Sequence, residues 1–205
     1  MICAGRGCVY AIFFGVFVCA QSFAVFGKDG KESKDLKSQD PLATATTANA
    51  VTKFQWSEHS KLSWDDFRGQ ADAVIDECAA VTHCGIGFTS NSTCPGSKPV
   101  IKVYNNFYIN KSWVRPDAKM PQILEHEQGH FDLCEIYTRK LRDRMSNFDA
   151  NTTDIKQSLM NIYNEISQEY ETRQQAYERE TTHGTNIPEQ KKWVDIISQE
   201  LQATI

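Results

Sequence analysis

The segment from Pro121 to Leu141 combines a helical pattern of apolar residues with two histidines on the same face. On a helical wheel this face carries Ile123, His126, His130, Leu133, Cys134, Tyr137 and Leu141. Asp132 points away from it. Proline suits a first helical turn, so we expect a helix to begin at Pro121. Histidines placed toward a core are costly without a partner, which favours a metal ion shared by the two imidazoles.

His126 and His130 are four residues apart, so their imidazoles lie one turn apart and can reach a single ion. Zinc binds imidazole nitrogen in tetrahedral sites, and a catalytic site uses three protein ligands and leaves one position for water. Glu127 lies at the edge of the same face and can contact that water without binding the ion. We therefore predict a Zn²⁺ site with Glu127 as its general base. The alternative is an ordinary amphipathic helix without a metal.

The third ligand must come from another part of the chain, because Leu133 and Ile136 stand where a metzincin has glycine and histidine. His183 ranks first, since it follows a long predicted helix and an imidazole at a helix end can turn into a cleft. Glu178 ranks second and would give a His-His-Glu set. Further alternatives on this chain are Glu165, Glu169, Cys134 and His83.

The order of strand and helix signals predicts an α+β fold, with a small N-terminal β-sheet followed by three helices. Residues 79–88 and 100–109 have the β-branched and aromatic composition of strands. After the helix at Pro121, a second helix is predicted from about Thr153 to Thr182, and a third from Pro188. The inward side chains of the third helix are predicted to be Trp193, Ile196, Ile197 and Leu201.

The first 50 residues have a different composition from the rest. Residues 1–24 contain Arg6, an apolar run and small residues suited to cleavage, which is the layout of a secretory signal peptide. Residues 25–50 are polar and without period, so they are predicted to be a flexible linker to a domain spanning 51–205. We therefore expect a secreted or periplasmic protein without a membrane span in the mature chain. Lipid anchoring through Cys19 is the less favoured alternative.

Seven cysteines are present, and four would remain after signal cleavage: Cys78, Cys84, Cys94 and Cys134. An even number in an oxidising compartment predicts two disulfides with three possible connectivities. If Cys84 pairs with Cys94, then Cys134 pairs with Cys78. Simple packing of Cys134 in the core is the alternative to that pairing.

A formal net charge of -4 gives no electrostatic case for nucleic-acid binding, which favours a basic face. No repeat is present. The length of 205 residues is sufficient for one domain with its own core. The remaining class of partner is a peptide or protein substrate, which could add to the strand at 100–109 by backbone pairing.

Several stretches resemble the DUF922 family of bacterial proteins. They are HEQGHFD on the predicted helix, LSWDDF from Leu62 to Phe67, YERETTHG from Tyr177 to Gly184, and Trp193 in the last helix. The resemblance extends over nearly all of the predicted domain. It implies a zinc-dependent protease with a zincin-like architecture, and it implies a functional role for His183 in the His-Gly pair.

Two kinds of function are compatible with these patterns, and hydrolysis of an amide in a non-protein substrate such as a peptidoglycan stem peptide is a further possibility that shares the mechanism of the first. The first is an exported zinc metallopeptidase that hydrolyses peptide bonds, in which Glu127 activates the water held by the ion. In such an enzyme Tyr177 could donate to the oxyanion, although a core tyrosine is the simpler interpretation. The second is a non-catalytic binding protein with a structural metal, in which a fourth ligand such as Cys134 or Glu178 closes the site. An open coordination position distinguishes the two.

Overall fold

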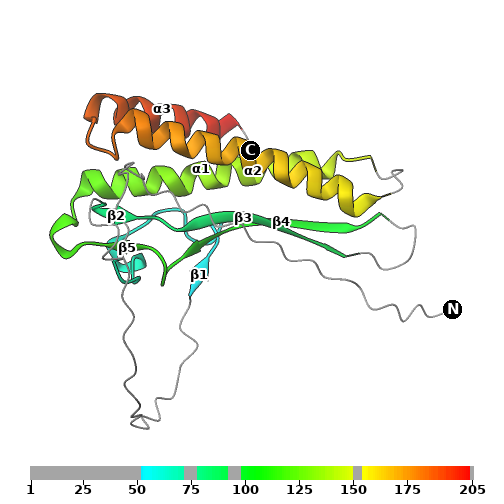
Figure 1. Ribbon diagram of the computed structural model, residues 1–205, viewed down its shortest axis with the longest axis horizontal. Coiled ribbons are helices and arrows are strands. Elements are labelled where there is room, and N and C mark those ends of the chain that lie inside the picture. Colours follow the sequence, from blue (N-terminus) through cyan, green and yellow to red (C-terminus); the bar gives the residue numbers. More distant parts are fainter. Residues whose placement is uncertain (1–51, 72–77, 92–97, 150–153, 204–205) are drawn as a thin grey trace, which may run out of the picture.

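The computed structural model describes residues 52–71, 78–91, 98–149 and 154–203 of the chain. Within these ranges it is an α+β protein in which short antiparallel strands precede three helices, as predicted (Figure 1). The predicted signal peptide at 1–24 and linker at 25–50 lie outside the described residues. None of the helices in the described ranges is long and apolar enough to cross a membrane.

The main sheet has three strands in the order β1-β4-β3, where β1 is Lys53–Phe54, β3 is Cys84–Asn91 and β4 is Val100–Tyr108. The strands β3 and β4 pair along their whole length, from Cys84 opposite Phe107 to Asn91 opposite Val100. The strand predicted at 100–109 is therefore confirmed.

The strand predicted at 79–88 is divided in two. Its first part is β2 (Ala80–Val81), which pairs with β5 (Trp113–Val114) in a separate ribbon, and its second part is β3. The break falls at His83, whose backbone N–H donates to the Ser112 hydroxyl at 2.9 Å. This side-chain contact replaces a ladder bond and lets the chain change partners.

The strand β4 lies between β1 and β3, which affects the prediction that a peptide could add to it. At Phe107 and Tyr108 both edges of β4 are already paired, with Phe54 and Lys53 on one side and with Cys84 of β3 and the His83 carbonyl on the other. This is the end of β4 that borders the histidine helix, since Phe107 packs edge-on against Phe131. A peptide therefore has no unpaired edge of β4 to add to at this end of the strand.

The helices begin and end close to the predicted residues. Helix α1 is Pro121–Ser146 with proline in its first turn, α2 is Ile155–Thr181, and α3 is Ile187–Ala203. The Asp154 side chain caps α2 by accepting from the Gln157 backbone N–H at 2.9 Å, which satisfies one of the unpaired donors of the first turn. Short 3₁₀ turns occupy Trp64–Asp66 and Pro116–Ala118.

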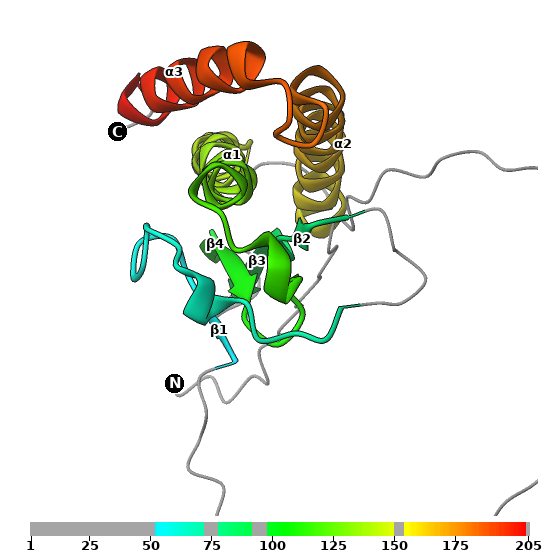
Figure 2. The same cartoon turned by 90° about the vertical axis from the view of Figure 1, so that its left-hand side faces the viewer.

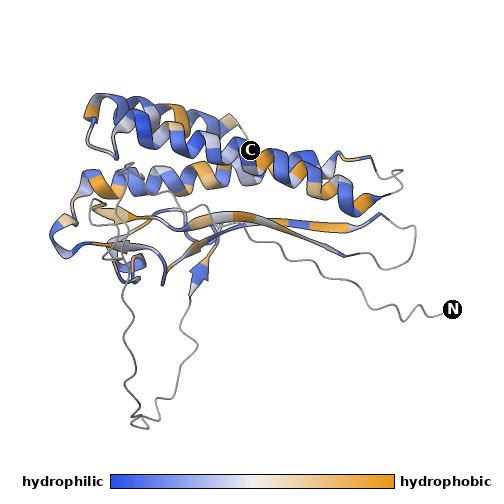
Figure 3. Ribbon diagram, in the orientation of Figure 1, coloured by the Kyte–Doolittle hydropathy of each residue, from blue (hydrophilic) through white to orange (hydrophobic). Residues whose placement is uncertain are grey.

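Helix α1 is the centre of the molecule. It lies between the strands on one side and the pair α2 and α3 on the other (Figure 2). Phe131, Leu133 and Ile136 are completely buried although they point in different directions around the helix. Hydrophilic residues predominate along the outer helices, whereas β3 and β4 carry hydrophobic residues (Figure 3).

This enclosure on two sides corrects the prediction that Asp132 points away from the buried face. Asp132 is buried, and its Oδ1 accepts from Trp56 Nε1 at 2.7 Å and from Gln128 Nε2 at 2.8 Å. Burial raises the pKa of Asp132, and these two donors oppose the increase. The prediction that Ile196 on α3 packs inward is also wrong, because this side chain is exposed.

The cysteines do not follow the predicted pairing. Cys84 and Cys134 are buried free thiols that share a hydrogen bond, and the Cys84 sulfur also lies 3.4 Å from the Tyr170 hydroxyl. The predictions that Cys134 pairs with Cys78 and Cys84 with Cys94 are therefore wrong for these two thiols, and packing of Cys134 in the core is the correct alternative. Cys94 lies outside the described residues.

Candidate metal centre

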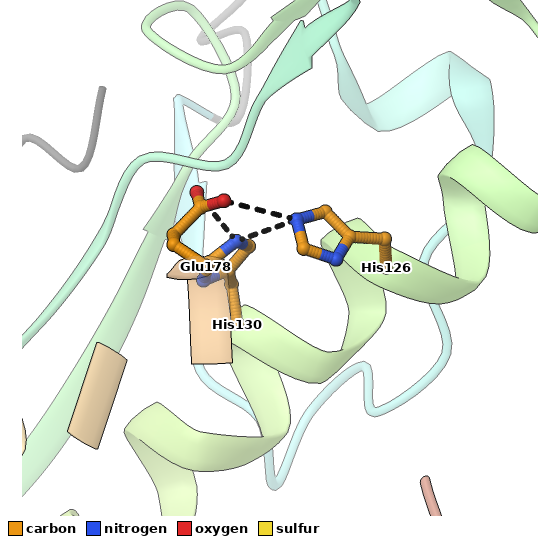
Figure 4. A group of neighbouring side chains, drawn as sticks. All are labelled: His126, His130 and Glu178. Carbon is orange, nitrogen blue, oxygen red and sulfur yellow. Dashed lines mark hydrogen bonds and ion pairs between the residues drawn. The ribbon is translucent and has the colours of Figure 1, made fainter. Parts of the chain in front are cut away.

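His126 and His130 project from adjacent turns of α1, and both rings are almost completely buried. Their Nε2 atoms face each other at 3.2 Å (Figure 4). Two such nitrogens can approach so closely without a shared ion only when one of them carries a proton. The spacing expected for one helical turn is therefore present, and both donor atoms point to the same place.

Glu178 on α2 completes the group. Its Oε1 lies 3.1 Å from His130 Nε2 and its Oε2 lies 3.5 Å from His126 Nε2 (Figure 4). Two ligands at zinc-binding distances of about 2.0–2.1 Å and a tetrahedral angle are about 3.3 Å apart. The two histidine nitrogens are separated by about this distance, and Glu178 brings a different oxygen to each of them. One donor atom from each residue lies within 4.8 Å of the others, so the group could hold a metal ion.

The three groups interact strongly without an ion. Burial alone would lower the pKa of His130, but the facing Glu178 carboxylate outweighs it and raises this pKa to about 9. Burial would raise the pKa of Glu178, but the two histidines hold it well below its usual range. The metal-free site therefore contains a carboxylate and an imidazolium, and an ion would displace the proton.

Glu127 is also buried, at 4 % exposure. Its backbone carbonyl accepts from the Thr82 hydroxyl at 3.2 Å, which attaches the strand segment to α1 at this point. Its Oε2 is enclosed and has no hydrogen-bond partner within the described ranges. An unpaired buried carboxylate oxygen is unfavourable, and it retains its full capacity to accept a hydrogen bond.

Two glutamines that the sequence analysis did not identify contact the other ring nitrogens of the histidines. Gln174 Oε1 lies 2.5 Å from His130 Nδ1, and Gln190 Oε1 lies 3.1 Å from His126 Nδ1. Both glutamines are 1 % exposed. A signal was present, because Gln174 falls between Tyr170 and Tyr177 on the buried stripe of α2, where a polar residue requires a partner.

Tyr177 packs directly on the site. Its ring stacks on the His126 ring with centroids 4.7 Å apart, and its hydroxyl donates to the His126 carbonyl at 3.0 Å. Gly129 makes room for this ring, because a Cβ at that position would overlap the Tyr177 hydroxyl. The hydroxyl is committed to the backbone, so the interpretation of Tyr177 as a core residue is favoured over an oxyanion donor.

His183 lies beside the site rather than within the group of donor atoms. The group that converges within 4.8 Å consists of His126, His130 and Glu178. His183 is half-exposed, and its Nδ1 lies 2.6 Å from Glu178 Oε2, on the solvent side of that carboxylate. The structure therefore places Glu178, which ranked second as the third ligand, next to the two histidines. His183, which ranked first, contacts Glu178 instead.

The backbone after α2 explains this orientation. Thr182, His183 and Gly184 have positive φ values of 48°, 54° and 77°, so the chain turns through three left-handed residues in succession. Such values are unusual for a β-branched residue such as Thr182. At Gly184 the turn passes so close to α1 that a Cβ would lie 2.8 Å from the Cβ of His126. Glycine is therefore required for both its φ and its size.

The other candidates lie apart from the group. Glu165 is exposed and pairs with Arg144, and Glu169 is also exposed. His83 packs edge-on against Tyr108, and its pKa is lowered by burial and by Lys111. Cys134 lies in the thiol pair beneath His130, and the exposed His59 pairs with Asp66.

Comparison with known proteins places these residues in a family. The family described as "Bacterial protein of unknown function (DUF922)" matches residues 20–184, which include α1, α2 and Glu178 but end before α3. No curated protein and no solved structure matches the chain. Because the matched range covers most of the 205 residues, the chain belongs to the DUF922 family.

Proposed function

We propose that this protein is a zinc-dependent hydrolase that cleaves peptide bonds, with His126, His130 and Glu178 as the metal ligands. The observation that carries the proposal is the convergence of these three donors within 4.8 Å, together with the unpaired buried oxygen of Glu127, whose charge acts on His130. Imidazole nitrogen and carboxylate oxygen are common zinc donors, and a His-His-Glu set is typical of catalytic sites.

Zinc bound at this site would lower the pKa of water and polarise a carbonyl group. Glu127 would accept a proton on Oε2 and transfer it to the leaving amine, because this oxygen has no competing donor in the described structure. The buried histidines keep bulk water from the donor atoms, and Glu178 is the partly exposed member of the set. A secreted or periplasmic location remains part of the proposal.

The alternative is a non-catalytic binding protein with a structural metal, which would require a fourth protein ligand. Among the described residues the converging group has three members. Cys134, the thiol named above as a possible fourth ligand, is hydrogen-bonded to Cys84. These observations favour a site with one open position, and hence the hydrolase.

The test is the hydrolysis of an unbiased peptide library by the zinc-loaded protein and by Glu127→Gln. We expect cleavage by the wild type and a loss of about 10²- to 10⁴-fold in the variant, with zinc content and fold unchanged. Equal cleavage by both proteins would remove Glu127 from the role of base. No cleavage of any peptide by the zinc-loaded wild type would favour the binding protein.

A further inference from the structure

We propose that Gln174 and Gln190 are positioning residues that hold His130 and His126 with a proton on Nδ1, so that both Nε2 atoms face Glu178 and are the atoms that would bind the ion. This inference rests on the proposed metal site and extends it to helix α3. It is carried by two buried hydrogen-bond chains, one for each histidine, in which every donor and acceptor can be assigned.

The first hydrogen-bond chain determines the orientation of the Gln190 amide. The Tyr177 hydroxyl uses its only proton on the His126 carbonyl at 3.0 Å, so towards Gln190 it can only accept. Gln190 Nε2 donates to that hydroxyl at 2.8 Å. The Gln190 amide is thereby oriented with Oε1 towards His126 Nδ1, 3.1 Å away. Because an amide oxygen can only accept, Nδ1 must carry the proton, and Nε2 is left for the ion.

The second hydrogen-bond chain orients the Gln174 amide in the same way, with its oxygen towards the histidine. Its Nε2 donates to the His130 carbonyl at 3.0 Å and to the Tyr170 hydroxyl at 2.8 Å, so both amide protons are used. Its Oε1 then faces His130 Nδ1 at 2.5 Å and accepts from it. In both hydrogen-bond chains the glutamine amide accepts from its histidine ring and is also linked to the backbone carbonyl of the same histidine. Gln174 donates to the His130 carbonyl directly, whereas Gln190 reaches the His126 carbonyl through the Tyr177 hydroxyl.

The choice of an amide over a carboxylate has a chemical consequence. Metal-binding histidines commonly donate their second nitrogen to a carboxylate, which makes the ring a stronger ligand. A neutral glutamine orients the ring equally well without adding negative charge to a site that already contains Glu178 and Glu127. The arrangement therefore favours an electron-poor ion, which suits activation of a carbonyl better than permanent metal storage.

Helix α3 is part of this site because it supplies Gln190. Trp193, one turn later, packs edge-on against Tyr177 with centroids 5.2 Å apart, and its Nε1 donates to Glu180 at 3.0 Å. These contacts attach α3 to the end of α2 that bears Glu178. The family match ends at residue 184, so this contribution comes from a helix beyond the matched range.

The test compares Gln190→Met and Gln174→Met with Gln190→Glu, which keeps an acceptor. Exposed glutamines on the same helices, in Gln199→Met and Gln175→Met, are the matched controls. Zinc affinity is measured by competition with a chromophoric chelator. We expect affinity to fall about 10- to 100-fold in each buried methionine variant and to stay near the wild-type value in the controls. In Gln190→Glu the carboxylate still accepts from His126 Nδ1, so affinity should equal or exceed the wild-type value. Buried methionine variants that fold and bind zinc as tightly as the wild type would overturn the proposal.

A second measurement requires no variant and no metal. Long-range ¹H–¹⁵N spectra of the metal-free wild type report which nitrogen of a neutral histidine carries the proton. We expect His126 to be protonated on Nδ1, and protonation on Nε2 alone would overturn the proposal even if the Gln→Met variants do not fold. If the wild type binds no zinc, the proposed function fails, whereas this spectrum still tests the orientation of His126 by Gln190.

Discussion

His183 Nδ1 lies 2.6 Å from Glu178 Oε2, while the same carboxylate faces both histidines of α1. This contact predicts different effects for two substitutions. Glu178→Ala removes a ligand and should abolish tight zinc binding. His183→Ala removes only a hydrogen bond that orients the carboxylate, and should weaken binding by about 10- to 100-fold. Chelator competition measures both, and equal loss in the two variants would identify His183 as a ligand.

Gly129→Ala should destabilise the protein, because its Cβ would overlap the Tyr177 hydroxyl and lie 2.7 Å from Tyr177 Cζ. We expect a loss of about 1–3 kcal/mol in the free energy of unfolding, as is usual for overpacking in a core. Urea denaturation of the metal-free protein measures this loss. Gln175→Ala on the exposed side of α2 is the control and should change little. A Gly129→Ala protein as stable as the wild type would show that Tyr177 can move.

The stability of the metal-free protein should decrease as the pH rises from about 6.5, the ordinary histidine value, to about 9. In this range the folded protein retains the proton on His130 that the unfolded chain has released. The free energy of unfolding therefore falls by on the order of 1 kcal/mol per pH unit. Urea denaturation in the presence of a chelator at several pH values measures this slope.

Two variants test the origin of that slope. Glu178→Gln removes the carboxylate that raises the pKa of His130, so its profile should be flatter over this range. His59→Gln changes an exposed histidine that pairs with Asp66 rather than with Glu178, so this variant should retain the wild-type slope. A wild-type profile without any decrease between these pH values would contradict the ion pair of His130 and Glu178.

Cys84 and Cys134 should be free thiols that are protected by burial, since they are 3 % and 0 % exposed. We expect alkylating reagents to modify them in the denatured, unreduced protein but not in the native protein. Peptide mass spectrometry identifies the modified residues. Failure to modify both in the denatured, unreduced state would contradict the free thiols and indicate that a disulfide had formed.

The sequence predicted the elements that depend on local signals. The positions of Pro121 and Pro188 indicated where α1 and α3 begin, and the residue spacing of His126 and His130 indicated that both would reach one point. The order of strands before helices also gave the α+β class. These features depend on backbone preference and periodicity, which a single sequence contains.

The contacts made between elements could not be predicted in the same way. The orientation of His183 depends on three consecutive left-handed residues, and Thr182 gives no signal of such a turn. Gln190 reaches His126 only because α3 folds back over α1. Asp132 is buried because α1 is covered on two sides, whereas a helical wheel assumes a single covered face.

The most direct test of the account is the zinc content of the purified protein after dialysis, compared with that of His130→Ala. The account predicts about one zinc ion per chain in the wild type and none in the variant, while circular dichroism shows that both are folded. Wild-type protein that contains no zinc after reconstitution, or a folded His130→Ala variant that retains a full equivalent, would contradict it.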